Sequence, residues 1–401
     1  MHVELHERYR ELPAAREAQD LIRACVHCGF CTATCPTYLE LGDERDGPRG
    51  RIHLLIQLLE DGPVSERSQR HLDRCLSCRS CETTCPSGVR YGRLADIGRG
   101  LLEQRVPRRP LNRLQRWLLR KVIPNRRLFG LLAALGYAFR PILPAPVKAK
   151  LPRRRRPGRL PAPRHERRML LLEACAQSAA TPATNAAAIR VLDRLGILLE
   201  SIPGAGCCGA ISHHLSAHDE ALQHMRRNID AWWPAIERGA EAVVSTASGC
   251  GVMLTEYGSL LADDPRYTDK AARISGLARD LAEVVAAEDL DLLAGTSADR
   301  IAVHVPCTLY HGLRQPDLVQ SIMRRAGFDL AETSEPHLCC GSAGTYSILQ
   351  PDLSRRLAAR KVNALSGDAP DVIATANVGC QLQLAGASNR PVRHWIELLD
   401  R

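Results

Sequence analysis

Aromatic residues and long apolar runs are scarce in this sequence. Only 4% of residues are aromatic, and the uncharged run 128–139 holds 12 residues, whereas a membrane-spanning helix needs about 20. No transmembrane helix is therefore predicted. The N-terminal segment 1–17 is charged and lacks the apolar stretch of a secretory signal, so we expect the chain to stay in the cytoplasm. The sequence also lacks a P-loop, and no nucleotide site of its own is predicted.

Positive charge is concentrated in one segment. Residues 105–168 contain 20 lysines and arginines against one acid, and 10 of the 25 prolines, although the net charge of the whole chain is only +10. The remaining residues therefore sum to −9, with 34 basic against 43 acidic side chains. Such a change of composition is typical of a boundary, so 105–168 is predicted to be a basic, proline-rich linker between domains.

The linker contains a predicted amphipathic helix. Its apolar residues lie opposite its basic ones; the apolar face holds Leu111, Leu114, Leu118, Leu119 and Val122, and the basic face holds Arg113, Arg116, Arg120 and Lys121. No nucleic-acid binding is expected, because aromatic residues are few and no nucleic-acid-binding motif accompanies the charge. The pattern fits two interpretations equally well. One is contact with an acidic partner subunit or an anionic membrane surface, which for a cytoplasmic chain is the cytoplasmic face of the inner membrane. The other is a linker helix that packs on its own domain.

The strongest motif is a cysteine array that occurs twice. It reads Cys25-x2-Cys28-x2-Cys31-x3-Cys35-Pro36 and again Cys75-x2-Cys78-x2-Cys81-x3-Cys85-Pro86. This is the spacing of ferredoxins with two 4Fe–4S clusters, in which the fourth cysteine of each run binds the other cluster. The rule predicts one cluster on Cys25, Cys28, Cys31 and Cys85, and a second on Cys75, Cys78, Cys81 and Cys35.

A pair of zinc sites is the alternative interpretation, since Cys-x2-Cys pairs are common in zinc proteins. Zinc gives no reason for the same third and fourth spacing, followed by proline, to appear twice. His27 is interpreted as a neighbour that tunes the cluster potential, because four cysteines already suffice. Between the motifs, Ile52, Leu55, Ile56 and Leu59 share one helix face. Residues 1–104 are thus predicted to form a mainly helical two-cluster domain.

The other eight cysteines form a second repeat. Cys175 is followed by Cys207-Cys208-Gly209 and then by Cys250; Cys307 is followed, after the same interval, by Cys339-Cys340-Gly341 and then by Cys380. An internal duplication is predicted over 169–295 and 296–401. Each unit alternates apolar runs with helical segments, which favours α/β layers with mostly parallel strands. The predicted fold class is therefore α+β overall, with a helical ferredoxin-like domain followed by a duplicated α/β cysteine-rich domain.

Each cysteine group follows an apolar run, at the expected carboxyl end of a strand, where open α/β sheets bind ligands. We infer one or two further sites for a metal or cluster on Cys175, Cys207, Cys208, Cys250, Cys307, Cys339, Cys340 and Cys380, either an additional iron–sulfur cluster or zinc. The glycines in CCG and GC are expected to let the backbone approach the bound group. Buried cysteine in an ordinary core is the alternative.

No residue of this chain is predicted to be catalytic. His213, His214, His304, His311 and His337 could supply acid–base chemistry, but no paired carboxylate or nucleophile motif accompanies them. Each is interpreted as a surface histidine or as a neighbour of a bound group. Substrate chemistry is therefore expected on other subunits.

The two sets of motifs resemble a known family. The CCG repeats resemble the cysteine-rich domain of heterodisulfide reductase subunits, lactate-utilisation proteins and the C subunit of anaerobic glycerol-3-phosphate dehydrogenase. The likeness to iron–sulfur subunits of bacterial glycolate oxidase, also called glycolate dehydrogenase, extends nearly end to end through CVHCGFCTATCPTY, DGPRGRI, CLSCRSCETTCPSGVRY, NIDAWWPAIE, TASGCG, HLCCGSAGTY and RHWIELL. In heterodisulfide enzymes another cysteine precedes the last one by three positions, where this chain has Ala247 and Asn377.

This resemblance implies an electron-transfer subunit of an oxidoreductase complex. FAD-containing subunits would oxidise glycolate to glyoxylate, and this chain would pass the electrons toward a quinone or another acceptor, because a flavin takes two electrons while a cluster takes one. The alternatives are the same relay in a lactate or glycerol-3-phosphate system, and an iron–sulfur redox sensor without turnover. A zinc-only structural protein would be the remaining interpretation.

Overall fold

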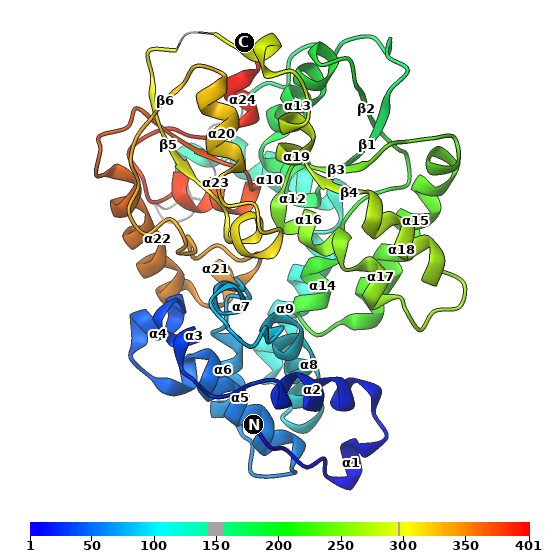
Figure 1. The fold of residues 1–401 in the computed structure, drawn as a ribbon, viewed down its shortest axis with the longest axis vertical. Coiled ribbons are helices and arrows are strands. Elements are labelled where there is room, and N and C mark those ends of the chain that lie inside the picture. Colours follow the sequence, from blue (N-terminus) through cyan, green and yellow to red (C-terminus); the bar gives the residue numbers. More distant parts are fainter. Residues whose placement is uncertain (143–154, 296) are drawn as a thin grey trace.

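The computed structural model describes residues 1–142, 155–295 and 297–401, and the predicted linker therefore lies partly outside the described residues. The fold is mixed, as predicted: a helical part at the N-terminal end adjoins two small parallel sheets covered by helices (Figure 1). The helical part consists of α1 (Glu7–Arg10), α2 (Pro13–Arg23), α3 (Phe30–Ala33), α4 (Pro36–Leu41), η1 (Glu44–Asp46), α5 (Pro48–Leu59), α6 (Glu66–Asp73), α7 (Ser80–Thr83) and α8 (Tyr91–Arg105).

Helix α5 lies between the two cysteine motifs and supplies much of the helical core. Pro48 occupies its first turn, where a missing N–H costs no hydrogen bond. The predicted apolar face of Ile52, Leu55, Ile56 and Leu59 is buried, packed among residues of α2 and α8. The cysteine loops before α3 and α7 are thus anchored on one apolar core.

The predicted linker forms two helices, α9 (Pro110–Val122) and α10 (Arg126–Ala138), followed by η2 (Arg140–Ile142). The amphipathic helix is confirmed as α9, but its orientation is unexpected. Arg116 is buried and pairs with Asp73 at 2.9 Å, whereas Leu111 is 82% exposed and Trp117 is 47% exposed. The ion pairs of this helix thus face the protein and much of its apolar surface faces outward. Among the described residues, no helix combines the length and apolar character that crossing a membrane requires.

The two cysteine repeats form sheets of the same topology. The first contains β1 (Arg168–Leu172), β2 (Leu198–Ser201), β3 (Val243–Ser245) and β4 (Ala278–Asp280) in the order β2-β1-β3-β4. The second contains β5 (Arg300–His304), β6 (Asp329–Leu330), β7 (Val372–Thr375) and β8 (Val392–His394) in the order β6-β5-β7-β8. All pairings are parallel, and Leu172 pairs with Ser245 as His304 pairs with Thr375.

Helices cover both sheets. The first repeat has α12 (Cys175–Ala180), α13 (Pro182–Arg194), α14 (Ala210–His214), α15 (His218–Glu237), α16 (Ser248–Thr255), α17 (Tyr257–Leu260), α18 (Thr268–Leu277), α19 (Leu281–Ala286) and η3 (Leu290–Leu293). The second has η4 (Thr308–Gly312), α20 (Leu318–Arg325), α21 (Tyr346–Leu349), α22 (Pro351–Ser366), α23 (Val378–Ala385) and α24 (Ile396–Leu399). The central strands are buried on both faces, as parallel sheets require.

The two repeats share one hydrophobic core. Leu171 and Val244 of the first sheet and Ile301 and Val303 of the second belong to the same buried cluster. Helix α24, at the C-terminal end, packs on α13 of the first repeat, and the two lie side by side in Figure 1. Extensive contacts cross the predicted domain boundaries at 104, 168 and 295. The division of the chain into separate domains at these positions therefore stays a prediction.

Candidate functional site

The two ferredoxin-type motifs fold into loops of the same shape. In the first, His27 and Gly29 have left-handed φ values of 58° and 83°; in the second, Ser77 and Arg79 have φ values of 52° and 62°. Each loop is followed by a short helix, α3 or α7. Thr34 and Thr84 join the two units through hydroxyl groups 3.1 Å apart. The repeated sequence thus gives a repeated backbone, which turns the cysteines of each loop toward a common hollow.

The first hollow is lined by the cysteines that the spacing rule grouped together. Cys25, Cys28 and Cys31 come from the first motif, and Cys85 reaches it from the second. Cys28 is exposed, and Val26 and Phe30 beside it are 68% and 60% exposed. This site therefore lies at the protein surface.

The second hollow is lined by Cys75, Cys78 and Cys81 together with Cys35 from the first motif. The structure thus brings together both predicted sets of four. The two hollows also have Pro48, Cys81 and Tyr91 in common as wall residues, so they are immediate neighbours.

Buried arginines surround the second hollow. Arg51 forms part of its wall and donates a hydrogen bond to the His71 carbonyl at 2.8 Å. Arg99 donates to the Cys75 carbonyl at 2.7 Å and to Ser77 Oγ at 2.9 Å. Two buried guanidinium groups, in an environment of low dielectric constant, favour the binding of a negatively charged group between the cysteines.

Burial works against free thiolates at these positions. Burial and then the neighbouring thiols raise the pKa of Cys78 and of Cys81 well above the ordinary thiol value, and burial raises the pKa of Cys31 to about 11. A bound cation would reverse this preference, because metal binding displaces the thiol protons. The donor set therefore fits a thiolate-ligated metal cluster, whose positive metal ions would stabilise the thiolates that burial alone disfavours.

The cysteines of the second repeat also gather in one place. Cys307 Sγ and Cys339 Sγ are 3.8 Å apart, and Cys340 and Cys380 lie beside them. In the first repeat, hydrogen bonds from the Cys175 and Cys208 thiols hold the pKa of Cys207 well below its ordinary value. Cys208 also contacts Cys250, which completes that set. Each repeat thus assembles the four cysteines that the sequence predicts.

The CCG glycines are required by the backbone turn and by close packing. Gly209 and Gly341 have left-handed φ values of 91° and 80°, and a Cβ on Gly341 would lie 2.7 Å from the Ser354 carbonyl oxygen. Their N–H groups point to Cys207 Sγ at 3.5 Å and Cys339 Sγ at 3.4 Å. Approach of the backbone to a bound group stays a prediction.

The segment 204–209, GAGCCG, fits the letters of a dinucleotide-binding glycine motif. It follows β2 at the sheet edge and leads into the short helix α14. In a dinucleotide site the motif would follow the first strand and open a longer helix, so these letters alone do not indicate such a site, and the absence of a nucleotide site stays a prediction.

The second hollow adjoins the second repeat. Leu76, Cys339 and Tyr346 belong to one buried apolar cluster, and Cys78 and Cys307 pack against it. Cys307 is among the thiols that raise the pKa of Cys78, after burial. The three cysteine sites therefore form a continuous series from the surface hollow, through the second hollow, to the second repeat.

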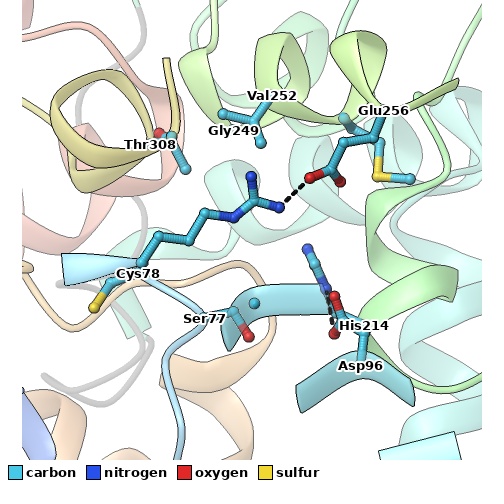
Figure 2. A pocket seen from close by; sticks show the side chains of 12 residues that line it. Ser77, Cys78, Asp96, His214, Gly249, Val252, Glu256 and Thr308 are labelled. Atoms are coloured by element: carbon cyan, nitrogen blue, oxygen red, sulfur yellow. Dashed lines mark hydrogen bonds and ion pairs between the residues drawn. The ribbon is translucent and has the colours of Figure 1, made fainter. Parts of the chain in front are cut away.

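A small pocket lies where the helical part meets both repeats (Figure 2). Arg79 forms an ion pair with Glu256 of the first repeat, and His214 Nδ1 is 3.1 Å from Asp96. His213 pairs with the same carboxylate at 3.5 Å. Burial would raise the pKa of Asp96, but His214 and His213 hold it well below its ordinary value. These contacts join the helical part to the first repeat.

Two family models match the chain. One described as "4Fe-4S dicluster domain" matches residues 21–89, and one described as "Cysteine-rich domain" matches 169–255 and 301–385. The "Glycolate oxidase iron-sulfur subunit" of Escherichia coli (strain K12) is 52% identical over 100% of this chain and 99% of its own length. The chain belongs to the family of glycolate oxidase iron–sulfur subunits.

Other relatives are more distant. The "Probable glycolate oxidase iron-sulfur subunit" of Bacillus subtilis (strain 168) is 31% identical over 90% of this chain and 87% of its own. "Lactate utilization protein A" of the same organism is 27% identical over 53% of this chain and 91% of its own. Family membership confirms an iron–sulfur protein with 4Fe–4S clusters and an electron-transfer role. The matched ranges contain all sixteen cysteines.

For His304, the structure excludes one of the two interpretations made from the sequence. It is not a surface histidine, because it is 1% exposed. Neither ring nitrogen has a hydrogen-bond partner among the described residues, and its role as a neighbour of a bound group stays a prediction. Burial and then Lys361 hold its pKa well below the ordinary histidine value. The signal in the sequence was its place three positions before Cys307, at the end of an apolar run.

Proposed function

We propose that this chain is the electron-transfer subunit of a complex in which FAD-containing subunits oxidise glycolate to glyoxylate, and that it delivers the electrons to a quinone or another acceptor. The observation that carries the proposal is the 52% identity to the Escherichia coli subunit over the full length of both chains. The same relay in a lactate system is the second candidate, favoured by the 27% identity to a lactate utilization protein over half of the chain.

The cluster ligands belong to this proposal. We assign one 4Fe–4S cluster to Cys25, Cys28, Cys31 and Cys85, and the other to Cys75, Cys78, Cys81 and Cys35, because each set lines one hollow. When bound, such clusters accept and release one electron at a time. Arg51 and Arg99 would stabilise the more negative, reduced state at the second set by their charge. The eight remaining cysteines are proposed to hold a further iron–sulfur cluster or zinc.

The route is supported by the order of the sites. The first hollow opens at a surface with two exposed apolar side chains, Val26 and Phe30, which suits docking of another subunit. The second hollow is next to it and borders the second repeat. The chain itself is proposed to do no substrate chemistry, since His213 and His214 at the interface are already paired with Asp96.

The test is electron paramagnetic resonance (EPR) on the chain purified anaerobically with its copurifying flavoprotein subunits. Glycolate is expected to produce reduced-cluster signals that approach those produced by dithionite. Signals with lactate but not glycolate would move the assignment to the second candidate. Clusters reduced by dithionite but by neither hydroxy acid, with flavin shown to be bound, would contradict the proposed substrate class and favour a sensor.

A membrane contact through 105–168 is also proposed, with an anionic lipid surface as the occupant. The exposed residues of α9 include Leu111, Leu114, Trp117 and Leu118, and α10 adds Leu131 and Leu135. Exposed basic side chains such as Arg113 and Arg127 accompany them. Apolar side chains flanked by basic ones, with tryptophan among them, are the pattern of helices that lie in a membrane interface.

Vesicle flotation tests this contact on the full chain. The double variant Leu114→Ser, Trp117→Ser should lose most binding to vesicles containing anionic lipid, while Leu292→Ser, which removes a similarly exposed leucine outside this segment, should keep it. Undiminished binding by the double variant would contradict the membrane proposal. Loss of copurifying subunits with vesicle binding unchanged would assign this surface to a protein partner instead.

A further inference from the structure

His304 is a buried polar side chain that the proposed function leaves unexplained. It ends β5, is 1% exposed, and both of its ring nitrogens lack a hydrogen-bond partner among residues 1–142, 155–295 and 297–401. A buried polar group without a partner destabilises the folded protein, because it has lost its hydrogen bonds to water. A residue that carries such a cost calls for a bound group that supplies the missing interaction.

The ring is directed at the cysteines of the second repeat. One ring nitrogen of His304 and the sulfurs of Cys340 and Cys380 all lie within 4.8 Å of one another. Cys307 is three positions further along the chain, and its sulfur is 3.8 Å from that of Cys339. The second repeat therefore presents one nitrogen and four sulfur donors at a single buried place.

The first repeat lacks this nitrogen donor. Strand β1 precedes Cys175 as β5 precedes Cys307, so the counterpart of His304 is Leu172, which pairs with Ser245 as His304 pairs with Thr375. Leu172 is completely buried. Two copies of one fold thus differ at a position beside the cysteines of the repeat.

A second difference between the two repeats also concerns a polar side chain near the cysteines. Helices α15 and α22 contact the CCG glycines at Ala221 and Ser354, and two turns further along they carry Asn228 and Lys361. Asn228 is neutral and donates to the Cys207 carbonyl at 2.9 Å. Lys361 is buried and donates to the Glu335 carbonyl at 2.7 Å. The second site has an ammonium group where the first has an amide.

We propose that His304 is a nitrogen ligand of the metal group held by the second repeat, so that this repeat has a mixed nitrogen and sulfur site with a donor at a position where the first repeat has leucine. The metal is iron in a cluster or zinc, since both accept imidazole together with thiolate. This inference rests on the proposed metal binding by the repeats.

The substitution of imidazole for thiolate has a functional consequence if the metal is iron. Where His304 binds in place of one of the four thiolates, the ligand set carries one negative charge less and the reduction potential rises, as it does in two-iron centres with two histidines. The positive charge of Lys361 would also raise the reduction potential of the site. Since this site borders Cys78, it would be an acceptor of higher potential than the first repeat, next to the second ferredoxin-type cluster.

The test uses the full chain labelled with nitrogen-15 in histidine, and His304→Leu, His304→Cys and His53→Leu variants. Metal analysis identifies the metal; pulsed EPR then detects nitrogen coupling to an iron cluster, or zinc K-edge absorption detects a nitrogen neighbour of zinc. Wild type and His53→Leu should show the nitrogen ligand. His304→Leu should lose it together with at least half of the metal at this site, and His304→Cys should keep the metal but replace nitrogen by sulfur.

The outcomes separate this inference from the proposed function. Metal at the repeats with sulfur ligands only, unchanged in His304→Leu, would overturn the role of His304. Absence of any metal beyond the two ferredoxin-type clusters would overturn it as well. In either case, reduction of those clusters by glycolate would leave the relay intact, whereas failure of that reduction would contradict the relay without affecting the nitrogen signature.

Discussion

Gly341 provides a quantitative test of the structure around the second cysteine repeat. Its φ is +80°, and a Cβ there would lie 2.7 Å from the Ser354 carbonyl oxygen and 2.9 Å from Leu357 Cβ. Alanine in the left-handed region costs about 1–2 kcal/mol, and forcing two packed backbone segments apart costs about 1–3 kcal/mol. Gly341→Ala should therefore destabilise the protein by about 2–5 kcal/mol.

Matched variants separate the two contributions. Gly209 has φ of +91°, but a Cβ there would lie 3.0 Å from its nearest neighbour, so Gly209→Ala should cost mainly the backbone part, about 1–2 kcal/mol. Gly367 has φ of −57° and open space around the added carbon, so Gly367→Ala should change stability by less than about 1 kcal/mol. The expected order of stability is Gly367→Ala, then Gly209→Ala, then Gly341→Ala.

Thermal unfolding of the anaerobic protein, followed by circular dichroism, measures this order. A loss of about 1 kcal/mol lowers Tm by about 2–4 °C in a domain of about 150–250 residues, so Gly341→Ala should melt at least about 4 °C below wild type. A Tm for Gly341→Ala equal to that of Gly367→Ala would refute the packing described for the CCG turn. Metal analysis of each variant shows whether displacement of the adjacent cysteines also weakens metal binding.

Three further predictions concern other parts of the chain. Cys85→Ser should abolish the EPR signals of the cluster assigned to the first motif, although Cys85 belongs to the second; loss of the other cluster alone would contradict the exchange of ligands. Asp96→Asn should destabilise the protein by about 3–5 kcal/mol, because His214 loses a buried partner. The pKa of Asp96 is lowered in the folded protein, so this stabilisation is present above the unfolded pKa of about 4 and is lost as the pH falls below it. Calorimetry should therefore show the Tm of the wild type falling toward that of the variant in acid. Arg116→Leu should destabilise the chain by about 3–5 kcal/mol in urea denaturation, while exposed Arg113→Leu on the same helix should change it by about 0.5 kcal/mol or less; equal effects would contradict the orientation of α9.

Local chemistry made the ferredoxin-type sites predictable. The spacing of Cys25 to Cys35 and its repetition grouped eight cysteines into two sets of four, and each set lines one hollow. The same holds for the duplicated sheets, because the apolar runs and the equal spacing of the two CCG groups imply one topology twice. Ligation itself stays a prediction in both cases.

Tertiary contacts explain what the sequence did not reveal. The amphipathic pattern of α9 predicted a helix but could not say that Arg116 would turn inward, because its partner Asp73 lies on another helix. The need for Gly341 arises from α22, which packs against it. His304 could be recognised only once the fold had placed it beside Cys340 and Cys380 with no other partner among the described residues.

The most direct measurement is freeze-quench EPR of the complex mixed anaerobically with glycolate and then with an acceptor quinone. The relay predicts that reduced-cluster signals appear within one turnover and disappear when the quinone is added, and that Cys78→Ala, in the wall nearest the second repeat, slows quinone reduction at least tenfold while flavin reduction stays fast. Quinone reduction at the full rate in Cys78→Ala, with its second cluster shown to be absent, would contradict the relay.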